Sequence, residues 1–111
     1  MAFDEVLADR VRGLLGAEPG VTEKRMFGGL AFLVHGHMAV SASGQGGLLV
    51  RVDPADTAQL VSRAHADRFV MRGREMDGWL RVDAEGVATA PQLQRWVMTG
   101  VAYARSLPPK R

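Results

Sequence analysis

Apolar side chains recur with helical spacing near the two ends of the chain. The first stripe predicts a helix from residue 4 to about 15, and the second predicts one that follows Thr89 and runs to about residue 106. Gln92 stands three positions after Thr89, as in a capping box. The stripes consist of Phe3, Val6, Leu7, Val11, Leu14 and Leu15, and of Leu93, Trp96, Val97, Gly100, Val101 and Ala104.

Between residues 21 and 52 the apolar runs become short and are separated by glycine-containing turns. We predict strands at residues 23–27, 30–35, 37–43 and 48–52. The pair His35-Gly36 suits a tight hairpin turn, because glycine adopts positive φ at little cost. Such short links between neighbouring strands favour an antiparallel meander. The run 30–34 hardly alternates, so its strand should be central or covered on both faces.

A further helix is expected to begin after Asp53, which is a good N-cap, with Pro54 at the first helical position. It should run to about residue 66, with Leu60, Val61 and Ala64 as its apolar face. Strands are predicted near 68–71 and 78–82, with turns at 77–78 and 85–86. The order α-β-β-β-β-α-β-β-α indicates an α+β fold with an antiparallel sheet, and we expect residues 1–111 to form one domain.

Composition and charge exclude several classes of protein. The 111 residues include no cysteine, which excludes disulfide scaffolds, cysteine zinc sites and cysteine nucleophiles. No apolar run approaches the length of a membrane span, and the N-terminus lacks the features of a secretory signal. We therefore expect a cytoplasmic protein. The formal net charge of +2 is too small to indicate nucleic-acid binding by itself.

Basic residues are nevertheless concentrated in two places. Residues 63–74 contain four arginines and one acid, and residues 24–29 join two bases and an aromatic to paired glycines. The arginines fit a solvated surface, with a nucleic-acid footprint as the alternative. The paired glycines either allow another backbone segment to pack closely or form an edge that a partner recognises. The candidate partner-binding residues are Lys24, Arg25, Arg72 and Arg74.

The sequence contains no clear motif for catalysis, metal binding or cofactor binding. His35 and His37 flank a turn glycine and read as exposed turn residues rather than a metal site. The glycines at 44–47 precede a strand, whereas a phosphate loop precedes a helix, so they read as a flexible hairpin connection. No serine lies in a Gly-x-Ser-x-Gly elbow. The methionines at 26, 38, 71, 76 and 98 read as core filler, with an adaptable binding groove as the alternative. We expect no cofactor and no enzymatic activity.

Several motifs resemble a known family. Lys-Arg-Met-Phe-Gly-Gly-Leu-Ala-Phe (24–32), Val-His-Gly-His-Met-Ala (34–39) and Gly-Arg-Glu-Met-Asp-Gly-Trp (73–79) are similar to motifs of the TfoX N-terminal domain family, relatives of the TfoX/Sxy competence regulators. The resemblance closes with residues 93–97 and 106–110 and so covers nearly the whole chain. Glu75 stands where the family has proline.

The resemblance implies a secretion-chaperone-like α+β fold, in which helices pack on a curved antiparallel sheet. It also implies a stand-alone N-terminal-type domain that serves transcriptional regulation through protein partners, with DNA as a second candidate partner. An alternative from the residues alone is a self-associating domain or a small-ligand carrier. In that case strand 48–52 and helix 93–107 would be candidate dimer surfaces.

Overall fold

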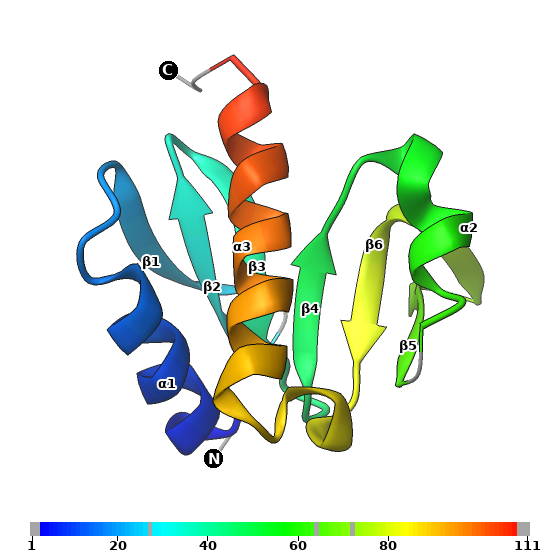
Figure 1. The fold of residues 1–111 in the computed structure, drawn as a ribbon, viewed down its shortest axis with the longest axis horizontal. Coiled ribbons are helices and arrows are strands. Elements are labelled where there is room, and N and C mark those ends of the chain that lie inside the picture. Colours follow the sequence, from blue (N-terminus) through cyan, green and yellow to red (C-terminus); the bar gives the residue numbers. More distant parts are fainter. Residues whose placement is uncertain (1–2, 27, 64, 72, 109–111) are drawn as a thin grey trace.

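A computed structural model describes residues 3–26, 28–63, 65–71 and 73–108. Within these residues the elements follow one another as α-β-β-β-β-α-β-β-α, so the predicted order and the α+β class are confirmed (Figure 1). Short 3₁₀ helices at Pro54–Asp56 and Ala84–Val87 precede the second and third α-helices. The elements are α1 (Glu5–Leu15), β1 (Val21–Met26), β2 (Gly29–Val34), β3 (His37–Ala42), β4 (Leu48–Arg51), α2 (Thr57–Leu60), β5 (Ala66–Met71), β6 (Arg74–Val82) and α3 (Ala90–Ser106).

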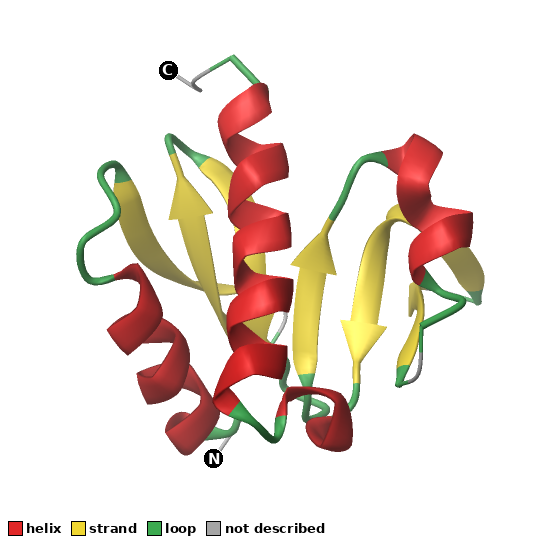
Figure 2. Ribbon diagram, in the orientation of Figure 1, coloured by secondary structure: helices red, strands yellow, loops and turns green. Residues whose placement is uncertain are grey.

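The strands form an open antiparallel sheet in the order β1-β2-β3-β4-β6-β5. β1 to β4 are the predicted meander. The chain then passes through α2 to the far edge of the sheet and returns, so that β6 rather than β5 pairs with β4. Helices α1 and α3 cover one face of the sheet, and α3 packs across β2, β3 and β4 (Figure 2). The opposite face carries no described helix.

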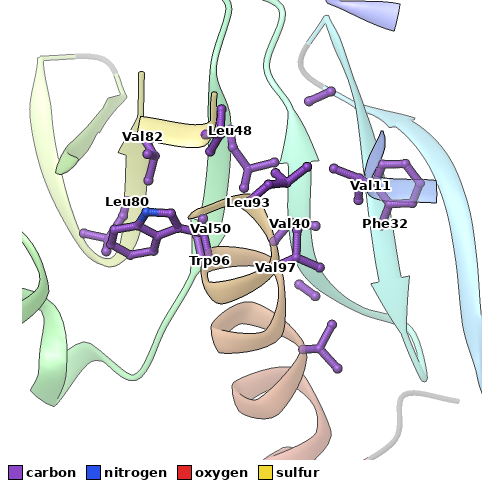
Figure 3. Packing of buried hydrophobic residues seen from close by; sticks show 14 of the residues in the cluster. Val11, Phe32, Val40, Leu48, Val50, Leu80, Val82, Leu93, Trp96 and Val97 are labelled. Atoms are coloured by element: carbon purple, nitrogen blue, oxygen red, sulfur yellow. The ribbon is translucent and has the colours of Figure 1, made fainter. Parts of the chain in front are cut away.

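The main core lies between the sheet and these helices (Figure 3). All six stripe residues predicted for α3 are buried. Gly100 lies so close to β3 that a Cβ at this position would overlap the Ala39 carbonyl oxygen. The capping box at the start of α3 is formed, because Thr89 accepts a hydrogen bond from the Gln92 amide and the Gln92 side chain accepts one from the Thr89 amide.

The predictions for the N-terminal half hold with one exception. Asp4 caps α1 by accepting a hydrogen bond from the Leu7 amide at 3.1 Å. His35 and Gly36 both have positive φ, as the predicted hairpin turn requires. β2 is buried along most of its length between β1 and β3, as expected. The exception is Val6, which is 71% exposed because α1 turns Leu7, Ala8 and Val11 toward the core instead.

Two local predictions are wrong. The second helix ends at Leu60, not near residue 66, since residues 61–63 turn away from the helix; Ala64 lies outside the described residues. Residues 77–78 do not form a turn between strands. They lie inside β6, which begins at Arg74 and is longer than predicted.

The two surfaces suggested for dimer formation are used within the chain. β4 is a central strand, paired with β3 on one side and β6 on the other. Its residues Leu48 and Val50 are fully buried, as are Val97 and Val101 of α3. The face of β4 that carries Leu48 and Val50 and the apolar stripe of α3 are therefore not available to a second copy.

Candidate binding groove on the helix-free face of the sheet

A second apolar cluster lies on the face of the sheet that carries no described helix. Side chains alternate between the two faces of a strand. In β4, Leu48 and Val50 belong to the main core, whereas Leu49 belongs to this second cluster. Ala31, Met38 and Leu49 form its buried floor, and Met26, Leu33, Phe69 and Trp79 pack around them.

The cluster surrounds a groove of about 550 Å³. Each of the six strands contributes at least one side chain to it, although β1 and β5 are the opposite edges of the sheet. Strong curvature of the sheet is therefore required, because flat strands about 4.8 Å apart would keep these edges well separated. The groove is lined by Lys24, Met26, Leu33, Gly36, Met38, Leu49, Arg51, Phe69, Met76 and Trp79.

A bulge in β6 shapes one wall of the groove. Arg68 pairs with Leu80 but the next residue, Phe69, pairs with Met76, so β6 accommodates three extra residues at 77–79. Gly78 has a φ of +87°, a conformation that glycine adopts at little cost. After residue 78, β6 lies between β4 and β5 in the sheet. Before residue 78, it pairs with β5 alone. Met76 and Trp79 consequently both reach the groove.

The bulge is held from the helix side of the sheet. Thr57, at the start of α2, is buried, and its Oγ1 accepts a hydrogen bond from the Gly78 amide at 2.7 Å. The Gly78 carbonyl accepts a hydrogen bond from the Val52 amide at 2.9 Å. Short as it is, α2 therefore supplies a contact that fixes the shape of the groove.

The charged residues that line the groove are cations. Lys24 projects from β1 and Arg51 from β4. The Arg51 guanidinium carbon lies 5.1 Å from the centre of the Trp79 ring and 5.6 Å from that of Tyr103. These rings orient the guanidinium by cation–π attraction. Within the described residues, neither cation forms an ion pair. The groove thus combines an apolar floor with positive charge at its margin.

The structure separates the residues predicted to bind a partner. Lys24 lines the groove, but its neighbour Arg25 is on the opposite face, where its guanidinium lies 5.8 Å from the Phe3 ring. Arg74 is exposed and stands two positions before Met76, which places it on the groove face of β6. Arg72 lies outside the described residues.

Three of the methionines predicted as core filler belong to or border the second apolar cluster: Met38 is buried in its floor, as predicted, and Met26 and Met76 are partly buried. Met26, Met38 and Met76 line the groove, and Met98 is partly exposed on α3. The side chain of Met71 lies outside the described part of the structure. Methionine side chains are flexible and polarizable, which suits surfaces that adapt to a bound partner. Core filler describes Met38, while the positions of Met26 and Met76 are compatible with the groove alternative.

Arg51 is a site residue that the sequence reasoning missed. It follows three apolar residues in a predicted strand, and alternation from Leu49 could have placed it on the same face. The residues around Arg51 in the sequence do not indicate that this face of the sheet is free of helices, because the tertiary structure determines which face the helices cover. Trp79, the last residue of the 73–79 motif, lies in the groove wall.

The other motifs have local structural roles. His37 Nε2 lies 2.6 Å from the Pro108 carbonyl oxygen, while His35 is exposed in the hairpin turn. Gly29 approaches β3 so closely that a Cβ would overlap the Ala42 carbonyl oxygen, which confirms a packing role for this glycine; at Gly28, which has positive φ, an added Cβ would meet nothing within 4 Å. Arg81 donates hydrogen bonds to the carbonyls of Gln45 and Gly46 and so holds the glycine-rich connection.

A second hollow, of about 510 Å³, lies beside the first turns of α3 and is also lined by two cations. Arg63 and Arg95 line it, and the Arg63 guanidinium carbon lies 5.5 Å from the centre of the Trp96 ring. His65 also lines it and forms an ion pair with Asp83 when protonated. Hydrogen bonds from the Gly86 amide and His65 lower the pKa of Asp83 against the opposing effect of burial.

The described residues contain no group of three or more histidine, aspartate or glutamate side chains placed to hold a metal ion. None of the described helices has the length and apolar character needed to cross a bilayer.

The sequence of the chain matches a known protein family. The family model for the TfoX N-terminal domain matches residues 13–104, which include every strand, α2 and most of α3. No curated protein matches the chain.

Proposed function

The chain belongs to the TfoX N-terminal domain family, and on this premise we propose that it is a non-catalytic binding module that serves transcriptional regulation through a protein partner. The binding surface is the groove on the helix-free face of the sheet. A partner rather than a substrate suits the lining, because methionine, leucine and aromatic side chains offer adaptable apolar area and not acid–base groups.

The observation that carries this proposal is the second apolar cluster. Phe69 and Trp79 pack on a sheet face that no described helix covers, so their apolar surface is partly left to solvent. Exposed apolar surface of this kind, bordered by charged residues, is typical of interaction sites. Aromatic, methionine and arginine side chains are also the residue types enriched at protein interfaces.

A small-ligand carrier is a second candidate, favoured by the size of the groove. Its volume of about 550 Å³ lies within the range of small-molecule sites. Against this, all the lining residues belong to one curved sheet and one of its turns, so the side of the groove away from the sheet is left open. Small-molecule sites enclose most of the ligand surface, whereas a protein partner needs contact on one side.

The proposal is tested by comparing two single substitutions in partner capture. Met76→Glu places a carboxylate in the groove, and Val6→Glu places one at an exposed position on α1, on the other side of the sheet. Each variant and the unaltered chain would be immobilised in equal amounts, with folding checked by circular dichroism. Proteins captured from a native lysate would then be quantified by mass spectrometry, with and without nuclease.

We expect a nuclease-resistant protein that the unaltered chain and Val6→Glu capture equally and that Met76→Glu loses at least about tenfold, since a buried unpaired charge costs several kcal/mol. Equal capture by Met76→Glu would exclude the groove as the binding surface. Capture that nuclease abolishes and that Arg95→Glu weakens would indicate nucleic acid at the basic hollow instead.

A further inference from the structure

We propose that the occupant of the groove is an amphipathic helix of the protein partner whose apolar stripe is flanked by acidic residues. This inference rests on the proposed function and names the partner's chemistry. It follows from three properties of the groove: its side chains, its shape and its charge.

The side chains suit an apolar helix face. Met26, Met38 and Met76 adjust their conformations to fit side chains of different shape, and Phe69 and Trp79 supply large flat surfaces. Grooves that bind amphipathic helices use this combination, and they accept apolar anchors at helical spacing.

The shape of the sheet also suits a helix. On its other face, β2, β3 and β4 already seat the 17-residue α3. The groove runs over the same strands, with Leu33, Met38 and Leu49 in its lining, and extends to residues of β1, β5 and β6. A helix with its side chains is about 10–12 Å wide, or two to three strand spacings. A helix seated here would give the central strands a helix on both faces.

The charge determines which amphipathic helix fits. Lys24 and Arg51 line the groove, and Arg74 stands on the same face next to it. Arg51 is held against Trp79 and Tyr103, so its planar group is oriented before a partner arrives. An oriented guanidinium favours bidentate contact with a carboxylate. A helix with glutamates beside its apolar stripe is therefore complementary, and one with lysines there is repelled.

The test uses two synthetic helical peptides, each about four turns long, with the same leucine and phenylalanine stripe at positions i, i+3, i+4 and i+7. One peptide carries glutamates beside the stripe, and the other carries lysines at the same positions. Binding of each fluorescein-labelled peptide to the full chain would be measured by anisotropy. Circular dichroism would report whether the peptide gains helix on binding.

We expect the glutamate peptide to bind at least about tenfold more tightly than the lysine peptide, because several partly exposed charge pairs together reach this difference. Lys24→Glu should reduce that preference, and Lys24→Glu with Arg51→Glu should reverse it. Arg25→Glu is the matched control. It alters the adjacent cation of the same strand on the opposite face, so the preference should remain.

Equal binding of the two peptides, with both lost in Met76→Glu, would overturn the acidic-helix inference and leave the groove as the binding surface. Loss of preference in Arg25→Glu as large as in Lys24→Glu would also overturn it. Binding of decanoate without binding of the glutamate peptide would favour a small anionic amphiphile. A dimer in sedimentation analysis that Met76→Glu dissociates would assign the groove to a second copy of the chain.

Discussion

The Thr57 side chain accepts a hydrogen bond from the Gly78 amide, and this bond joins the four-residue helix α2 to the bulge of β6. The two residues are 21 positions apart, and the bond is buried. It keeps the bulge in a conformation from which Trp79 lies opposite Arg51 in the neighbouring strand. The helix side of the sheet thus controls the groove on the other side.

Thr57→Val should destabilise the fold and weaken binding in the groove. Valine has nearly the shape of threonine but cannot accept the hydrogen bond, so the Gly78 amide is left buried without a partner. The expected loss in the free energy of unfolding is about 1–3 kcal/mol. Urea denaturation measures it. Thr57→Ser retains the hydroxyl, so it should retain most of the affinity for the glutamate peptide, and a Thr57→Val variant as stable as Thr57→Ser would contradict this role.

Gly78→Ala should be more damaging than Gly73→Ala. Both glycines have positive φ, +87° and +76°, and alanine pays about 1–2 kcal/mol there. At position 78 an added Cβ would also lie 3.1 Å from Pro54 Cγ and 3.3 Å from the Val52 carbonyl oxygen, whereas at 73 it meets nothing within 4 Å. We expect a loss of about 2–4 kcal/mol for Gly78→Ala. Similar denaturation midpoints for the two variants would show that the close approach has no energetic effect.

Alanine should have opposite effects at two helical glycines. Gly13, exposed in α1, has no neighbour within 4 Å of an added Cβ, so Gly13→Ala should stabilise the protein by about 0.5–1 kcal/mol through helix propensity. In α3, Gly100→Ala gains the same propensity but forces the helix away from Ala39 and Val40 of β3. A net loss of about 1–3 kcal/mol is expected. Thermal unfolding of both variants would show whether the signs differ as stated.

The ion pair between α1 and β1 should make stability depend on acid pH. Arg12 donates two hydrogen bonds to the Glu23 carboxylate, Nε to Oε2 at 2.6 Å and Nη2 to Oε1 at 2.9 Å. These bonds lower the pKa of Glu23 against the opposing effect of burial. The pair therefore contributes stability at pH values above the unfolded pKa of Glu23, and this contribution is lost as the pH falls through the folded pKa.

Glu23→Gln removes this titration. The stability advantage of the unaltered chain over Glu23→Gln should be present at neutral pH, should decline below the unfolded pKa of glutamate, about 4.3, and should vanish only below the lowered folded pKa of Glu23. Urea midpoints of both proteins between neutral and acid pH would measure it. The advantage should shrink in high salt because the pair is partly exposed. An advantage that persists unchanged into acid would rule out the ion pair as its source.

Most of the fold could be predicted because its signals are local. The capping box at Thr89 and Gln92 and the hairpin turn at His35 and Gly36 are read from a few adjacent residues. Where hydrogen bonds to residues far away in the chain determine the local structure, local composition predicts the wrong element. Residues 77–78 have turn composition, yet they form a bulge because Thr57 and Val52 bind Gly78 on its two sides.

The candidate site was only partly accessible to sequence reasoning. Lys24 was identified as a partner-binding residue and lines the groove, whereas Arg25 was grouped with it and faces the other way. Strand alternation alone separates two neighbours onto different faces, but it does not tell which face the helices cover. Arg51 was missed for that reason.

The sequence by itself determined the order of helices and strands, because hydrophobic periodicity, caps and turn glycines act over a few residues. Only the tertiary structure decided that β6 lies beside β4 and that the sheet curves enough to bring β1 and β5 to one groove. The reason is physical. Strand pairing and curvature depend on contacts between residues far apart in the chain, such as Thr57 and Gly78, and no local pattern records them.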